Sequence, residues 1–400
     1  MKRSVFIIIG VVLVLILVAV WVYMLFFSTT SNETDKQFGD LDFGETTDTD
    51  YQEPVVEEEP VVDMETNQRL RQLTTRPVAG FTEILSDTNN PRTVLYMEIG
   101  TGHIYSINLI SGEEERISAT TIAETQKAEF SQDGTYVMIQ SGFETKKEFI
   151  LGEIPSTSST LSNTKLAEPI TSFSGTVDNQ FLYTIQTNAS TIGKVLDPSD
   201  VTNETLFTLP LREANVEWGS AASDSHYVYP KATRHLENFL YQIKNGVITR
   251  MPIDGRGLSA IGNDDLVLYA KQENDVYQSY FHTITTGTEV EMPFVQIPEK
   301  CIMGESDRPV TVCANSEYEF SELLPDSWYK GETSSSDSLW EIGLEGRQAT
   351  FLVNPEQTSG RKLDITQLQL ADDMENVYFT NQLDKTLWLY ERIPADTNQN

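Results

Sequence analysis

The residues best suited to covalent chemistry are two cysteines near the carboxyl end of the chain. Cys301 and Cys313 are the only cysteines present. They fall on two segments that are typical of paired strands in a hairpin centred on Asp307, and Cβ atoms of such cross-strand pairs lie about 4.5 to 5.5 Å apart, close to disulfide reach. In an exported domain we predict a disulfide between them. Two buried free thiols, or a metal pair without further ligands, are the alternatives.

Aromatic side chains crowd the segment that follows. The stretch "NSEYEFSELLPDSWYKGETSSSDS", Asn315 to Ser338, separates two apolar runs and carries Tyr318, Phe320, Trp328 and Tyr329. Long loops in compact domains are usually functional or disordered, and exposed aromatics suit a binding surface. We predict a binding site at these four residues. The alternative is that Trp328 and Tyr329 fold back to cover the domain, since aromatic rings also bury well.

Catalytic and metal-binding motifs are missing from the sequence. It has no G-x-S-x-G nucleophile elbow, no H-E-x-x-H zinc motif and no D-x-[DN]-x-[DN]-G calcium loop. Carboxylate pairs such as Asp264-Asp265 and Asp372-Asp373 fall in turns, where Asp usually bonds nearby backbone amides. We predict no catalytic residues, no metal and no cofactor. The four histidines are scattered, and we expect each to be a strand or loop residue: His103, His226, His235 and His282.

The overall charge excludes one class of partner. The 400 residues include 28 Lys and Arg and 60 Asp and Glu, which gives a formal net charge of -32. Such a field repels phosphate backbones, so no nucleic-acid partner is expected. A hydrophobic content of 39% with abundant Tyr, Phe, Thr and Val is ordinary for a folded β-rich protein.

The amino-terminal residues predict a membrane anchor. Val5 to Phe27 form an uncharged apolar run, long enough as a helix to span a hydrocarbon core of about 30 Å. The run exceeds the apolar region of a signal peptide and no small-x-small cleavage site follows, so an uncleaved anchor is favoured over a cleaved signal. Lys2 and Arg3 precede it, which predicts a cytoplasmic amino terminus and a single-pass type II protein in the cell membrane, with everything after residue 27 extracytoplasmic.

The next segment predicts a stalk. Residues 28–76 are rich in Thr, Asp and Glu and include "EPVVEEEPVV". Such a segment cannot bury enough apolar surface to offset its ordering entropy, and its like charges extend it. We predict a flexible acidic stalk over 28–76 that separates the anchor, 1–27, from a folded domain.

A repeat in the sequence predicts the strands that would position the cysteines and the aromatic residues. Strand-turn-strand segments, each followed by a third apolar run, occur seven times from residue 80 to the end. The centres of these third runs are spaced about 45 residues apart, the period of a four-stranded propeller blade. They are Tyr105, Ile150, Gly193, Tyr241, Phe281, Trp340 and Trp388.

This repeat predicts an all-β fold. Seven small twisted sheets, each apolar on two faces, cover one another when packed around an axis. A two-sheet sandwich with a second domain does not explain the constant internal order. We predict a seven-bladed β-propeller over 77–393 and a disordered tail over 394–400, preceded by the single transmembrane helix and the acidic stalk.

Two stretches carry a resemblance to a known family. "FSQDGTYVMIQ" followed by "EFILGEI", and "IYSINLISGEEERIS", resemble the WD40-like blades of TolB-type β-propellers, whose usual turn is Ser-Pro-Asp-Gly; here Gln132 replaces the Pro. The anchor, the acidic stalk and "LPDSWYKG" before "SDSLW" are similar to membrane-anchored propellers of candidate-phylum bacteria. That resemblance implies an envelope protein and supplies no activity.

Together these features predict a binding function. We expect a membrane-anchored extracytoplasmic propeller that is not an enzyme and that binds or scaffolds an envelope protein, a peptide or a glycan. The alternative is a propeller enzyme of carbohydrate hydrolase or lyase type. Its active site would lie at the central channel, so convergent carboxylates there favour the alternative and small apolar residues favour scaffolding.

Overall fold

The computed structural model describes residues 69–84, 92–143, 146–155, 159–175, 178–218, 225–304, 310–316, 323–343, 348–371 and 373–392. Regular structure in these ranges is almost entirely β, with one-turn helices α2 (Asp326–Tyr329) and α3 (Pro355–Ser359) and the 3-10 turn η2 (Pro298–Lys300). None of the helices described there is long and apolar enough to cross a bilayer. The predicted span Val5 to Phe27 and the predicted tail lie outside the described residues.

Within these ranges the strands form five four-stranded sheets and one seven-stranded sheet, all antiparallel. The first three sheets are β2 (Val78–Ile84), β3 (Thr93–Glu98), β4 (Ile104–Asn108) and β5 (Glu114–Ser118); β6 (Thr125–Phe130), β7 (Tyr136–Ser141), β8 (Glu148–Glu153) and β9 (Ser162–Leu166); and β10 (Ile170–Gly175), β11 (Phe181–Gln186), β12 (Thr191–Asp197) and β13 (Thr202–Leu209).

The remaining sheets complete the domain. The seven-stranded sheet holds β14 (Ala214–Glu217), β15 (Ser225–Pro230), β16 (Glu237–Lys244), β17 (Val247–Gly262), β18 (Leu266–Glu273), β19 (Val276–Thr283) and β20 (Thr288–Glu291). Two four-stranded sheets follow, namely β21 (Cys301–Met303), β22 (Thr311–Ser316), β23 (Asp337–Ile342) and β24 (Ala349–Val353), and then β25 (Ile365–Leu370), β26 (Asn376–Asn381), β27 (Leu387–Glu391) and β1 (Leu70–Gln72).

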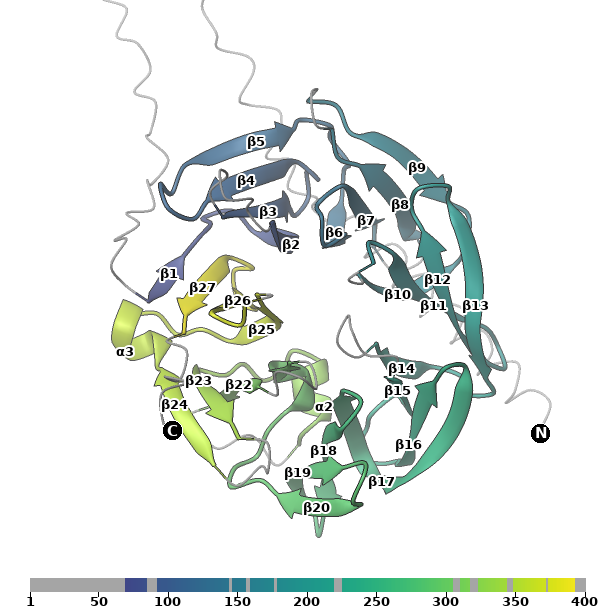
Figure 1. Ribbon diagram of the computed structural model, residues 1–400. Coiled ribbons are helices and arrows are strands. Elements are labelled where there is room, and N and C mark those ends of the chain that lie inside the picture. The colour runs from purple at the N-terminus through teal and green to yellow at the C-terminus, as the bar shows by residue number, and fades with distance from the viewer. Residues whose placement is uncertain are drawn as a thin grey trace, which may run out of the picture. The chain divides into compact units, whose positions relative to one another are not determined.

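The sheets follow one another in chain order around a common centre (Figure 1). Contacts between first strands join neighbouring sheets, β2 with β6, β6 with β10, and β21 with β25. Within the seven-stranded sheet, β14 also contacts β17. In the four-stranded sheets the first strand lies toward the centre and the fourth strand toward the outside (Figure 1). A domain built this way places loops and inner-strand side chains around a channel.

The sequence repeat coincides with this arrangement at six of the seven predicted central positions, which fall on the third strand of a sheet, whereas Phe281 lies on β19, the sixth strand of the seven-stranded sheet. Two of the seven positions, Ile150 and Gly193, are not aromatic. At Gly193 on β12 a Cβ atom would lie only 2.1 Å from Cε1 of Phe207, which belongs to the neighbouring strand β13. The ring of Phe207 therefore occupies the space that a side chain at position 193 would fill.

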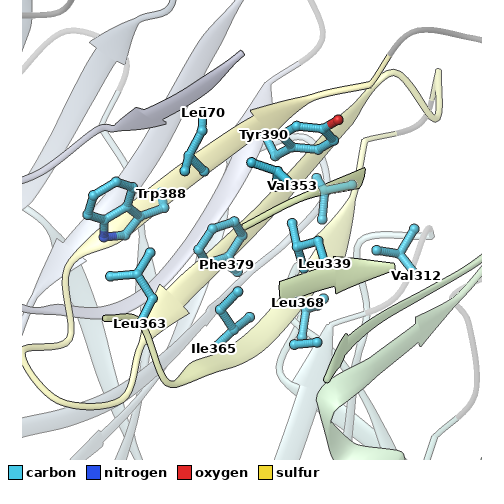
Figure 2. Close-up of a cluster of buried hydrophobic side chains, with 12 residues drawn as sticks. Leu70, Val312, Leu339, Val353, Leu363, Ile365, Leu368, Phe379, Trp388 and Tyr390 are labelled. Carbon is cyan, nitrogen blue, oxygen red and sulfur yellow. The ribbon is translucent and has the colours of Figure 1, made fainter. Parts of the chain in front are cut away.

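The hydrophobic core lies between sheets and is divided among them. Figure 2 shows one cluster, in which Val312 and Leu339 from one sheet meet Ile365 and Phe379 from the last sheet. A second cluster joins the last sheet to the first, where Tyr378 packs with residues of β2 to β4. Each sheet buries its two apolar faces against the neighbouring sheets. The repeated packing therefore stabilises sheets that are too small to be stable alone.

The last sheet is completed by the first strand of the described chain. β1 pairs antiparallel with β27, with Leu70 opposite Tyr390. Leu70 and Leu73 are buried in the clusters between sheets. The acidic composition predicts these residues to be part of the stalk, but the structure places them in the last sheet. The strand β27 pairs with β1, and the clusters between sheets bury Leu70 and Leu73. Composition alone does not reveal these partners.

Candidate functional site

The two cysteines are bonded in the structure. Cys301 on β21 lies opposite Cys313 on β22 in the strand register. Their sulfur atoms are 2.07 Å apart, so the two residues form a disulfide. The turn at Asp307 lies outside the described residues. The bond joins the inner strand of the sixth sequence repeat to the strand from which the long aromatic loop departs.

Part of that aromatic loop folds back toward the centre of the ring. Tyr318 and Phe320 lie outside the described residues, whereas Trp328 and Tyr329 fall on α2, which lies toward the centre in Figure 1. Leu324, only 2% exposed, anchors the segment in a cluster that includes Tyr277 and that Trp328 also contacts. The loop thus covers apolar surface mainly through Leu324.

Polar contacts hold α2 to the neighbouring sheet. Asp326 accepts hydrogen bonds from the Thr233 hydroxyl at 2.7 Å and from the Arg234 backbone N–H at 2.8 Å. Burial by itself would raise the pKa of Asp326, but these hydrogen bonds to the charged form outweigh it and lower the pKa below its ordinary value. Gln272 Nε2 also donates to the Leu324 carbonyl at 2.5 Å. The segment is therefore fastened on both sides of its apolar anchor.

Trp328 and Tyr329 lie between two cavities. Both side chains line a cavity of about 840 Å³ on one side and a cavity of about 410 Å³ on the other. Tyr329 is 38% exposed, while Trp328 is half-buried. The Tyr329 hydroxyl donates to Glu299 on η2. Trp328 thus packs partly on the domain and Tyr329 keeps an exposed ring, while the predicted binding role of the two residues stays a prediction.

The larger cavity continues inward along the first strands of the sheets. Its wall includes Phe149, Ile170 and Val216, together with the carboxylates of Glu217 and Glu299. A further cavity of about 400 Å³ shares the two carboxylates and is lined as well by residues of β6, β10, β17, β21 and β25. Glu217 and Glu299 therefore mark the place where the two cavities meet.

These two carboxylates influence each other. Burial, with the nearby charge of Glu299 as a second cause, raises the pKa of Glu217 to about 8. Burial also raises the pKa of Glu299, although hydrogen bonds from Tyr329 and Tyr229 act against it. The Tyr229 hydroxyl lies 3.3 Å from Glu299 Oε1. With a pKa of about 8, Glu217 is mostly protonated at neutral pH.

Lys127 is the cation that contributes to this site. It acts electrostatically on Glu217 and lowers its pKa, against the effect of burial. Its ammonium group also pairs with Glu129 at 3.2 Å and donates to the Phe173 carbonyl at 2.8 Å. The charge of Lys127 is thus shared among several acceptors and does not neutralise Glu217 and Glu299.

A buried ion cluster lies directly behind the carboxylate pair. Lys300, the neighbour of Glu299 on η2, donates to Asp337 and Asp364 at 2.6 Å each and to Ser335 at 2.5 Å. Neither Lys300 nor Asp337 is exposed. The turn η2 consequently directs one charged side chain to the channel and the next into the protein, which ties the channel wall to β23 and to the start of β25.

Sequence reasoning missed Glu217, Glu299 and Lys300, although one signal was present. Glu217 in "NVEW" and Glu129 in "KAEF" occupy equivalent positions of the repeat, one residue before an aromatic. Both are charged residues on first strands, which face the channel. A charged residue on a first strand therefore indicates a side chain that faces the channel. Glu299 and Lys300 lie between repeats, so no such pattern marks them.

The described residues hold no group of three or more His, Cys, Asp or Glu side chains that is arranged to bind a metal ion. What the site offers is a cavity lined both by aromatic rings and by two carboxylates whose pKa values are raised by burial. Such a pair can accept hydrogen bonds from a ligand, bind a cation or transfer a proton.

The inner-strand channel, the sheets around it and the loop over it define a β-propeller. No protein-family model and no curated protein sequence matches the chain. Among solved structures it is similar to the β-propeller domain of the Trilobed protease from Pyrococcus furiosus, at 14% identity and a TM-score of 0.49, over 80% of this chain and 99% of that one.

Two further solved structures are similar at lower scores. One is TolB from Acinetobacter baumannii, at 11% identity and a TM-score of 0.41, over 67% of this chain and 62% of that one. The other is a chain of the nidogen/laminin complex, at 10% identity and a TM-score of 0.35, over 53% of this chain and 78% of that one.

Proposed function

We propose that the protein is a membrane-anchored, extracytoplasmic propeller that binds or scaffolds an envelope protein, a peptide or a glycan. The ligand enters at the end of the channel where α2 lies. The observation that carries this proposal is the position of Trp328 and Tyr329, which line cavities on both sides of α2. An aromatic pair on a fastened segment beside a cavity is what a binding hot spot requires.

The propeller of this proposal has seven blades. In that interpretation the seven-stranded sheet counts as two blades that share β17. The first half of this 16-residue strand pairs with β16, and the second half pairs with β18. Between the halves the register shifts near Gly257, whose φ of 65° is easily reached by glycine. The strand thereby passes from the outside of one blade to the inside of the next.

The binding proposal is tested by replacing both rings. We expect Trp328→Ala with Tyr329→Ala to weaken crosslinked capture of the partner from intact membranes by at least about 2 kcal/mol, the scale of an aromatic hot spot. Phe351→Ala is the matched control, because Phe351 is an exposed aromatic on the outer strand β24. Melting curves of all variants accompany the capture. Unchanged capture by the double variant with an intact fold would refute the proposed site.

The anchor and stalk are tested by proteolysis. Protease added outside intact cells or spheroplasts should cut before Leu70, because an extended acidic segment is more accessible than strands. The released fragment should keep β1 and remain folded. A fully protected carboxyl-terminal domain would contradict the proposed extracytoplasmic location.

One observation favours an enzyme as the second candidate. Glu217 and Glu299 face the same cavities, and Glu217, with a pKa of about 8, is protonated at neutral pH as a general acid must be. A glycoside hydrolase uses such a pair of carboxylates. Turnover of polysaccharide substrates that is lost in both Glu217→Gln and Glu299→Gln would establish this candidate. Binding without turnover supports the binding module.

A further inference from the structure

Two polar atoms near the junction of the channel cavities lack partners. Glu299 Oε2 and Trp218 Nε1 are both buried, and neither makes a hydrogen bond with any group in the described ranges. Trp218 is only 7% exposed and lines the same 400 Å³ cavity as Glu299. Leaving a buried donor or acceptor unpaired costs free energy, so unpaired groups in a folded protein call for an explanation. Here they are one acceptor and one donor beside one cavity.

The charge at the junction is also unbalanced. Within the described residues no Lys or Arg side chain lies within 4.0 Å of either carboxylate oxygen of Glu217 or Glu299. Buried carboxylates are ordinarily paired with a cation or hydrogen-bonded on both oxygens. A ligand that brings a positively charged donor would supply the missing partner.

Aromatic rings line the path to this junction. Trp328, Tyr329 and Phe149 all line the 840 Å³ cavity, which Glu217 and Glu299 line as well. Ring faces attract cationic groups, most strongly where water is excluded. The volume is in the range of pockets that enclose a ligand rather than a single ion.

We propose that the channel binds a polypeptide segment through an arginine or lysine side chain, whose cationic group lies between Glu217 and Glu299. A backbone carbonyl next to that side chain accepts the hydrogen bond from Trp218 Nε1. The inference rests on the proposed function and names the chemistry of its ligand. A polypeptide meets both requirements, whereas a polyamine offers no carbonyl and a neutral glycan offers no cation.

Binding of a cation displaces the proton that Glu217 holds. The groups that face Glu217 are Glu299 on η2, Lys127 on β6 and Tyr229 on β15. Glu299 additionally faces Tyr329 on α2 and Ser259 on β17, and the exposed Lys147 lines the outer cavity. Tyr277 on β19 also lies in the electrostatic range of Glu299. The affinity is therefore expected to rise as the pH rises toward 8, with release of a proton on binding.

The test uses calorimetry on the full-length chain in detergent micelles. The probes are the blocked tripeptide Gly-Arg-Gly and its citrulline analogue, which has nearly the same shape and no charge. We expect the arginine peptide to bind at least about tenfold more tightly, because a charge-assisted hydrogen bond is lost in the analogue. Titrations in two buffers of different ionisation enthalpy measure the released proton.

Three variants localise the effect. Glu217→Gln and Glu299→Gln keep the side-chain shape and are each expected to weaken binding of the arginine peptide at least about tenfold. Glu115→Gln is the matched control, since Glu115 is exposed on the outer strand β5 and lines neither channel cavity; its affinity should stay within about twofold. Melting curves verify that each variant is folded.

Several results would overturn the inference. They are equal affinity for the arginine and citrulline peptides, unchanged binding by both folded Gln variants, and no binding of the arginine peptide at about 10 mM. Spermidine binding as tightly as the peptide would show a free-amine site, and competition by a neutral oligosaccharide would show a glycan site. Partner capture that depends on Trp328 and Tyr329 but not on Glu217 would leave the binding module standing without its cation site.

Discussion

The ammonium group of Lys300 lies 2.6 Å from Asp337 Oδ2, and neither side chain is exposed to solvent. Asp364 completes the cluster from the start of the next sheet. An ion so placed loses its hydration, and its attraction to the two carboxylates compensates only while all three are present. The cluster therefore holds η2, and with it Glu299, in one position relative to two sheets.

Replacing Lys300 by Met should destabilise the protein strongly. The change leaves Asp337 and Asp364 facing each other in the interior without a cation, and we expect a loss of about 3 to 5 kcal/mol in the free energy of unfolding. Lys165→Met is the control, since its pair with Glu148 is exposed and should contribute less than about 1 kcal/mol. Denaturant titration of both variants measures the difference. Equal losses in the two variants would contradict the structural role of the cluster.

Replacing Gly193 by Ala should also destabilise, through a clash. The new methyl group would lie 2.1 Å from Cε1 of Phe207, which is much closer than a van der Waals contact allows. Forcing such an overlap in a packed region costs about 1 to 3 kcal/mol. Adding Phe207→Leu should recover part of the loss, because the smaller side chain makes room. Gly343→Ala, whose added atom would be 3.5 Å from its nearest neighbours, is the control. A double variant less stable than either single variant would refute this packing.

Removing β1 should weaken the closed ring. A chain that begins at residue 69 retains the pairing of β1 with β27, whereas a chain that begins at residue 77 loses it together with buried Leu70 and Leu73. We expect the shorter chain to lose at least about 2 kcal/mol, the cost of deleting one large buried apolar side chain. Thermal and denaturant melts compare the two chains. Identical stability would show that β1 contributes nothing to closure.

The raised pKa of Glu217 predicts a pH dependence of stability. Its ordinary value is 4.5 and its value in the folded protein is about 8. Between these values the unfolded chain is ionised while the folded protein keeps the proton, so rising pH lowers the free energy of unfolding, by up to about 1.4 kcal/mol per pH unit. Glu217→Gln should remove this slope, and its stability relative to wild type should increase from pH 5 to pH 8. Glu115→Gln, a change at an exposed residue of the outer strand β5, should leave the slope in place.

Much of the fold could be predicted because it is local and repeated. The alternation of apolar residues around Tyr105, Phe281 or Trp388 indicates strands wherever it occurs, and the hairpin register that brings Cys301 opposite Cys313 follows from turn spacing alone. These features depend on residues close together in the chain. They survive even where one repeat, at Gly193, lacks a side chain, because strand pairing uses the backbone.

The site was less predictable because it depends on residues distant in the chain. Glu217 and Glu299 belong to different repeats, and no spacing connects them. Lys300 has a type that is normally exposed, so only its partners reveal that it is buried. The strand β1 has three residues and no alternation, and its acidic surroundings predict a stalk. In each case tertiary packing, and not local pattern, decides the position.

The pairing of the first described strand with the last has a consequence for the order of events during synthesis. Arg71 on β1 and Glu391 at the end of β27 form an ion pair although 320 residues separate them. At about 5 to 20 residues per second, a ribosome needs about 15 to 60 s to make the intervening chain. During that time β1 has no strand to pair with and Leu70 lacks the late residues of its cluster, while earlier sheets can already assemble. Completion of the propeller therefore waits for the final strand, and a nascent chain arrested before Leu387 would present an unpaired apolar edge to chaperones and proteases.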